Sequence, residues 1–132
     1  MSFTESLSPR ARELINAFDP GALTRIDETL HPIAPHLVER LVKSIYEDAY
    51  QRDELSFRER HIATLSALVA FGDTARQLRF QGYAAFRHGF TWRDIEEILI
   101  QNAVFCGFSR AINAALVLNE VYHAFEAEGG GA

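Results

Sequence analysis

Cysteine is nearly absent from this chain of 132 residues, which contains only Cys106. A single thiol excludes an intrachain disulfide, a redox-active CxxC pair and a cysteine-rich zinc site. Basic residues are also outnumbered, because 13 Lys and Arg stand against 18 Asp and Glu, for a formal net charge of −5. Nucleic-acid binding needs clustered positive charge to neutralise phosphates, so we expect no nucleic-acid partner.

Long apolar runs are missing as well. No run reaches the length of about 18 residues that suggests a membrane span. The first ten residues, "MSFTESLSPR", lack the basic region and apolar core of a signal peptide. We therefore expect no membrane partner and a cytoplasmic location. With 48% apolar and 23% charged residues, the composition is that of one globular domain over residues 1–132.

Signals for strands are absent, and signals for helices recur along the whole chain. There is no alternating apolar pattern and no Asn-Gly hairpin, whereas Ser8-Pro9, Ser56 with Glu59, and Thr91 with Asp94 are helix-start patterns. The fold class is therefore predicted to be all-α, with about six helices and short connections. The helical segments lie within residues 8–18, 19–30, 35–53, 56–72, 73–89, 91–105 and 109–125, and residues 126–132 form a tail that we expect to fray.

The apolar residues of these segments suggest which faces are buried. In residues 35–53, Leu37, Leu41, Ile45 and Ala49 recur every four residues and predict one inward stripe. Residues 61–72 are apolar on nearly every side, which is typical of a fully buried helix. The last helix carries apolar residues on more than one face, which predicts a subunit interface and a homo-oligomer.

Two stretches resemble a known family. They are "EDAYQRDELSFRERHIATLSALVAFG" and "LRFQGYAAFRHGFTWRDIEEILIQNAVFCGFSRAINAALVLNEVY", and over residues 45–125 they look like the carboxymuconolactone decarboxylase family, a branch of the alkylhydroperoxidase D-like fold. The resemblance implies an all-helical domain that assembles into trimers or hexamers. The namesake reaction removes CO2 from a carboxylated muconolactone, and the peroxidase branch uses a CxxC pair with a nearby His and Glu.

The chain departs from this pattern at the positions that carry the chemistry. Counting back from Gly89, Thr74 and Gln77 fall where the peroxidase branch has its cysteines, which argues against a disulfide-cycling peroxidase. Gln81 falls where the family usually has a histidine, and His61 where it usually has a glutamate. His61 and Gln81 lie on helices joined by a turn at Gly72, eleven residues before it and nine after it, so we expect them at the same level.

The predicted catalytic residues are His61, as the proton donor, and Gln81, as a donor to an oxyanion. The alternative for His61 is a buried core histidine bonded to a backbone carbonyl, and the alternative for Gln81 is a group that bridges backbone atoms. Arg110, Gln77 and Thr74 are the predicted substrate-binding residues. Arg110 can grip a carboxylate with two parallel hydrogen bonds, or it can pair with a neighbouring subunit.

Two function classes fit these residues. One is a cofactor-free lyase, decarboxylase or isomerase of a small carboxylated lactone or related acid, because a conjugated lactone is its own electron sink. The other is a non-catalytic binding or interaction subunit on the same oligomeric scaffold. We expect no cofactor and no metal, since the five histidines complete no ligand motif. His88, at the end of its helix, is expected to cap it.

Overall fold

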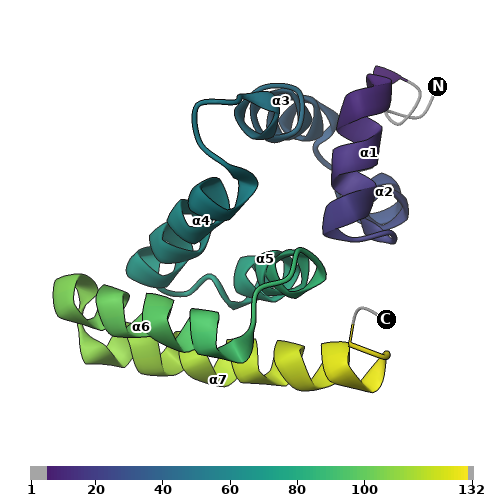
Figure 1. The fold of residues 1–132 in the computed structure, drawn as a ribbon. Helices are drawn as coiled ribbons and strands as arrows, with labels where there is room; N and C mark the ends of the chain where they lie inside the picture. The colour runs from purple at the N-terminus through teal and green to yellow at the C-terminus, as the bar shows by residue number, and fades with distance from the viewer. Residues whose placement is uncertain (1–5, 131–132) are drawn as a thin grey trace. The chain divides into compact units, whose positions relative to one another are not determined.

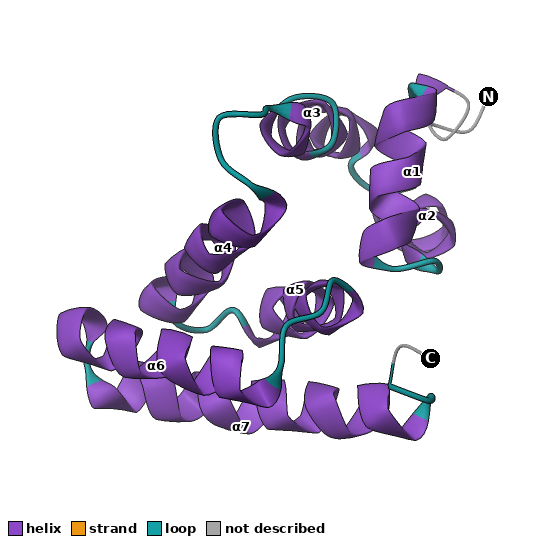
Figure 2. Cartoon of the chain, viewed as in Figure 1, coloured by secondary structure: helices purple, strands orange, loops and turns teal. Residues whose placement is uncertain are grey.

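The computed structural model describes residues 6–130, and every regular element in that range is helical (Figures 1 and 2). Seven α-helices are present in this range, with one short π-helix and one short 3-10 helix. The all-α prediction is therefore confirmed. Contacts divide the chain into a unit of residues 1–57 and a unit of residues 58–132, which are described in turn.

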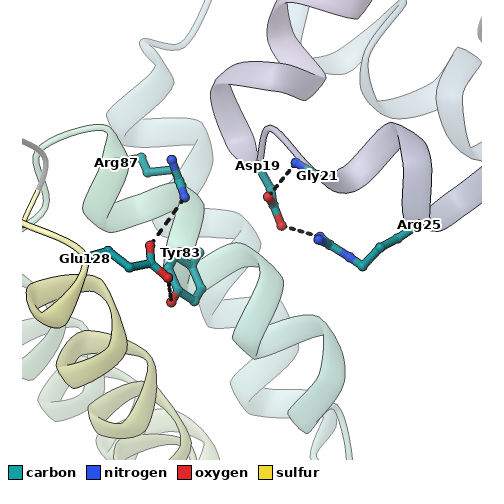
Figure 3. A network of polar contacts seen from close by, with 6 residues as sticks. All are labelled: Asp19, Gly21, Arg25, Tyr83, Arg87 and Glu128. Atoms are coloured by element: carbon teal, nitrogen blue, oxygen red, sulfur yellow. Dashed lines mark hydrogen bonds and ion pairs between the residues drawn. The ribbon is translucent and has the colours of Figure 1, made fainter.

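The first unit contains two helices of ordinary length and three short helical segments. They are α1 (Pro9–Phe18), α2 (Ala22–Arg25) with the π-helix η2 (Ile26–Leu30), α3 (Pro35–Ile45) and the 3-10 helix η3 (Ala49–Gln51). Ser8 caps α1 as expected, because its side chain accepts a hydrogen bond from the Ala11 N–H, and Pro9 occupies the first helical position. Between α1 and α2, Asp19 accepts from the Gly21 N–H at 3.0 Å and pairs with Arg25 (Figure 3).

The inward stripe of α3 differs from the prediction by one residue. Val38, Val42 and Tyr46 are buried, whereas Leu37 is 57% exposed. Both sets repeat every four residues, so the period alone does not distinguish them. Packing decides between them, because the Phe18 ring meets the Tyr46 ring edge-on with the centroids 5.3 Å apart. The predicted stripe from Leu37 is wrong for this reason.

The helix α3 is also shorter than residues 35–53. It ends at Ile45, and the Gln51 side chain donates to the Tyr46 carbonyl at 2.8 Å. This side chain takes over an acceptor that the helix leaves open at its end. The chain then forms η3 before α4 begins.

The second unit contains α4 (Phe57–Phe71), α5 (Ala75–Arg87), α6 (Trp92–Cys106) and α7 (Phe108–Ala127), of which only Phe57 is assigned to the first unit. The antiparallel helices α6 and α7 lie side by side, and α7 also packs against α5 (Figure 1). Gly82 permits close packing there, because a Cβ on it would lie 2.7 Å from a Leu118 methyl carbon.

The helix α4 is buried along one face only, contrary to the prediction. Its buried residues are His61, Leu65 and Val69, while Phe71 is 81% exposed. Their four-residue spacing is that of one stripe on a helix. Ile62 and Leu68 are only half-buried within the described part of the chain, so the all-round apolar character of α4 does not correspond to full burial in one subunit.

Capping and ion pairs fix α6 against α4. Thr91 Oγ1 accepts from the Asp94 N–H at 3.1 Å, and Asp94 Oδ2 accepts from the Thr91 N–H at 2.9 Å, which is the expected reciprocal cap. Arg58 donates to Asp94 Oδ1 at 2.8 Å. Arg58 and then the Thr91 amide lower the pKa of Asp94 to about 2.

The end of α7 is tied to α5. Glu128 accepts from the Tyr83 hydroxyl at 3.0 Å and lies 3.8 Å from Arg87 (Figure 3). The backbone N–H groups of Gly129 and Gly130 donate to carbonyls of the last turn. Residues 131 and 132 lie outside the described residues, and fraying of residues 126–132 stays a prediction.

Candidate functional site

His61 and Gln81 lie at the same level, as the sequence predicts, but they meet through the backbone. His61 Nε2 lies 2.8 Å from the Gln81 carbonyl oxygen. A carbonyl oxygen only accepts, so Nε2 carries the hydrogen and donates it. The imidazole is fully buried. This is the core-histidine arrangement that stood as the alternative for His61.

Burial also decides the charge of His61. Removal from water disfavours the imidazolium and lowers its pKa from 6.5 to about 4, although the bond to Gln81 acts in the opposite direction. The side chain is therefore neutral near pH 7. A neutral imidazole whose proton is held by a carbonyl must first exchange that bond before it can protonate a substrate.

The Gln81 side chain has a different environment from its carbonyl. The residue is half-buried, but Oε1 is buried and accepts no hydrogen bond from any residue in the range 6–130. A buried acceptor without a donor costs roughly 1–3 kcal/mol. A hydrogen-bond donor from a water molecule or a ligand would therefore be favourable at Gln81 Oε1.

A separate pocket of about 200 Å³ lies at the other end of α4, within the second unit. It is open to solvent on one side and is formed by the end of α4, the Gly72–Asp73 turn, the start of α5 and the first half of α7. Most of its wall is apolar. The lining residues are Leu68, Val69, Gly72, Asp73, Thr74, Ala75, Leu78, Arg110, Asn113, Ala114 and Val117.

Two of the three predicted substrate-binding residues, Thr74 and Arg110, line this pocket. The Thr74 hydroxyl donates to the Leu68 carbonyl at 2.7 Å, which leaves its oxygen able to accept. Gln77 is exposed and does not line the pocket, and neither do His61 and Gln81. The five predicted residues therefore form two groups and one outlier, not one site.

Arg110 reaches from the start of α7 to the end of α4. Its Nη1 donates to the Phe71 carbonyl at 2.9 Å. A cation is disfavoured at a helix N-terminus, and the structure explains its presence because the guanidinium serves the C-terminal end of α4, where a cation is favoured. Within residues 6–130 it has no carboxylate partner at ion-pair distance.

Asp73, Asn113 and Asn102 are polar residues that were not among the predicted site residues, and Asp73 lines the pocket at the turn before α5. Asn113 lines the pocket one turn after Arg110, and the spacing of three residues on one helix was a signal for it. Asn102 is buried, and its Nδ2 has no hydrogen-bond partner among the described residues. Its signal was the amide pair Gln101 and Asn102 within the apolar run "ILIQNAVF".

The other singled-out residues have ordinary surroundings. His88 caps α5, because its Nδ1 donates to the Ala84 carbonyl at 2.8 Å, as expected. Cys106 is half-buried at the end of α6. Within residues 6–130, no three His, Cys, Asp or Glu side chains gather in the way a metal site needs, and no helix there is long and apolar enough to cross a membrane.

Large apolar side chains are exposed at the end of α4, in the second half of α6 and in the first half of α7, and we call this set the α6–α7 face. One member, Phe71, lies beside the pocket, since its carbonyl accepts a hydrogen bond from Arg110. Phe105 is 82% exposed and Phe108 is 73% exposed. Its residues are Phe71, Ile100, Val104, Phe105, Phe108, Ile112 and Leu116.

The fold and the pocket define an all-helical domain with a small, largely apolar binding site whose wall also carries one arginine, Arg110, and one carboxylate, Asp73. The family model of the carboxymuconolactone decarboxylase family matches residues 35–120, which is more than half of the chain. The chain therefore belongs to the carboxymuconolactone decarboxylase family, as its resemblance implies. A comparison with curated proteins finds no match.

Proposed function

We propose that this protein is a cofactor-free lyase, decarboxylase or isomerase that acts on a small carboxylated lactone or a related acid. The observation that supports this most is Arg110, a cation without a carboxylate partner in the described chain, on the wall of an apolar pocket of about 200 Å³. An apolar body with one anionic group matches such a wall.

The reaction can be written without a cofactor. The bond between the ring carbon and the leaving carboxylate breaks, CO2 departs, and the electron pair moves into the conjugated lactone as an enolate. Arg110 stabilises the resulting oxyanion or holds a second carboxylate. A proton then returns to a carbon of the ring, and the atoms and charges balance.

The proton step remains the proposed role of His61, with Gln81 as the oxyanion donor, but neither residue lines the Arg110 pocket. His61 lies seven residues, about 10 Å of helix, before Leu68 on the pocket wall, so this role requires the substrate to reach from the pocket towards the start of α4. This role also requires His61 to exchange its bond with the Gln81 carbonyl for one with the substrate or a bridging water. That requirement supports the second candidate, a non-catalytic binding subunit on the same scaffold. Both candidates use the same pocket, and they differ only in whether the bound acid is converted.

The test uses the purified protein with γ-carboxy-γ-butyrolactone and with a conjugated muconolactone carboxylate. Binding is followed by calorimetry, and conversion by NMR and CO2 release. Binding with conversion supports the enzyme, binding without conversion supports the binding subunit, and no binding of either compound overturns the proposed substrate class. If conversion occurs, turnover per folded molecule should vanish in His61→Ala and fall by about 10² in Gln81→Ala.

We also propose that the protein is a homo-oligomer, a trimer or a hexamer, assembled through the α6–α7 face. Seven large apolar side chains exposed together are costly in water and are typical of an interface. Light scattering should give a multiple of 14.9 kDa. Phe105→Glu should reduce the mass, whereas Ile33→Glu, at a residue that is 79% exposed in the first unit, should not. A wild-type monomer would overturn the assembly.

A further inference from the structure

The turn between α4 and α5 has an unusual backbone and an unusual neighbour. Gly72 has φ +72° and Asp73 has φ +53°, both in the left-handed region. The Arg110 guanidinium lies against the face of Gly72 where a side chain would be. A Cβ on Gly72 would come within 1.6 Å of Nη1 and 2.9 Å of Cζ.

The space beside Gly72 differs from that beside Gly89, the other glycine that ends a helix of this pair. Gly89 also has a positive φ, +92°, but a Cβ there would meet nothing within 4 Å. Both positions favour glycine for backbone reasons. Of these two glycines, only Gly72 also makes room for a charged group; a Cβ on Gly21 would likewise lie 2.7 Å from Arg25 Nη1, but Gly21 is outside the pocket.

Two features hold the Arg110 guanidinium at the pocket. The first is the hydrogen bond from Nη1 to the Phe71 carbonyl, and the second is the absence of a Cβ on Gly72. Arginine has many rotamers, and its side chain loses up to about 2 kcal/mol of entropy when it is fixed. An arginine that is held in place before a ligand arrives does not incur that cost on binding.

We propose that Gly72 is a positioning residue for Arg110, and that it makes the pocket select an anionic ligand over an uncharged one of the same shape. This inference rests on the proposed function, since it assigns the selectivity of the same pocket. A side chain at residue 72 would push the guanidinium away from the Phe71 carbonyl. The colliding atoms are the far end of a flexible side chain, so displacement is expected rather than unfolding.

The test compares Gly72→Ala with Gly89→Ala, the matched control that introduces backbone strain without a collision. The probes are γ-carboxy-γ-butyrolactone and its uncharged methyl ester. Wild type and Gly89→Ala should bind the carboxylate about tenfold or more tightly than the ester, as a charge-assisted hydrogen bond implies. In Gly72→Ala the ratio should fall to about one. A folded Gly72→Ala that keeps the wild-type ratio would overturn the inference.

A double variant distinguishes the loss of Arg110 positioning from general damage to the pocket. In an Arg110→Gln background, Gly72→Ala should have no further effect on the ratio of the two affinities, because the group that it displaces is already gone. Independent effects of the two changes would overturn the inference.

A measurement without a ligand separates this inference from the substrate class. The Arg110 side-chain N–H signals, assigned by their loss in Arg110→Gln, should be slowed in exchange in wild type and in Gly89→Ala, and averaged in Gly72→Ala. If neither probe binds wild type, the substrate class fails, and these signals alone decide the role of Gly72. Unchanged signals in Gly72→Ala would contradict it.

Discussion

Two polar regions of the second unit, the His61–Gln81 contact and the Arg110 pocket, differ in what their charges and hydrogen bonds serve. His61 is fully buried, neutral near pH 7, and bonded to a backbone carbonyl. Arg110 is exposed, charged, and bonded through Nη1 to the Phe71 carbonyl, with no carboxylate partner in the described residues. The imidazole of His61 is thus hydrogen-bonded within the core, whereas the charged guanidinium of Arg110 lines the pocket.

The two regions show that a reactive residue type at a position suggested by the family resemblance is not enough to form a binding site. The resemblance places His61 where the family usually has a glutamate, yet the N–H of its imidazole is bonded to the Gln81 carbonyl. Arg110 keeps four N–H groups beyond the one that bonds the Phe71 carbonyl, because a guanidinium carries five. The variants below test this contrast, beginning with the largest expected effect.

Removal of the His61 side chain should have the largest effect on stability. His61→Ala leaves a cavity in the core and removes a hydrogen bond, so we expect a loss of about 2–4 kcal/mol in the free energy of unfolding. Urea denaturation measures it. His123→Ala, at an exposed residue of α7, is the control and should change stability by less than about 0.5 kcal/mol. Equal, small losses in both variants would remove the core role of His61.

The pH dependence of stability should show the same difference. The pKa of His61 is 6.5 unfolded and about 4 folded, so between these values the unfolded chain binds the additional proton. Stability is therefore complete above pH 6.5, falls by about 3 kcal/mol as the pH drops to 4, and loses nothing more from this group below that. Denaturation at several pH values checks this, and His61→Gln should remove most of the slope. A slope unchanged in His61→Gln would assign it to other groups.

Arg110 should affect binding far more than stability. Arg110→Gln removes the charge at the pocket, and we expect γ-carboxy-γ-butyrolactone to bind roughly 10–100 times more weakly, with a stability change below about 1 kcal/mol. Arg93→Gln, at an exposed arginine of α6 outside the pocket, should leave the affinity unchanged. If Arg110→Gln instead lowers the oligomer mass and leaves affinity intact, its charge pairs with a neighbouring subunit.

The smallest overall effect is expected at Thr91, whose side chain only caps α6. Thr91→Ala removes one acceptor of the reciprocal cap of α6, and we expect a loss of about 1 kcal/mol in stability. The affinity for the lactone should not change. Calorimetric melting measures the first and binding the second, and a changed affinity would mean that the cap supports the pocket.

The sequence predicted the helices well and the buried faces less well. Ser8, Thr91 and Gly89 mark helix ends through bonds or backbone angles that involve only nearby residues, so their signals are local. The stripe of α3 was misplaced by one residue because Val38 and Leu37 begin equally good four-residue repeats. Only the contact between Phe18 and Tyr46 distinguishes them.

The candidate site was predicted in part for similar reasons. His61 and Gln81 were expected to lie opposite each other on two neighbouring helices, because they are nearly the same number of residues from the short turn between them. Which atom of Gln81 the imidazole meets does not follow from counting, since the backbone and the side chain lie at the same level. Gln77 was placed with Thr74 by their spacing, but Gln77 is exposed while Thr74 lines the pocket.

The sequence by itself determined that this protein is all-helical, belongs in its family, and has no cysteine pair for disulfide chemistry. Those properties depend on residue types and on spacings within one helix or one turn. Tertiary structure alone decided that Arg110 lies over Gly72 and holds the Phe71 carbonyl, across 39 positions of sequence. Such a contact depends on how α7 packs at the end of α4, and no periodic pattern in either helix encodes it.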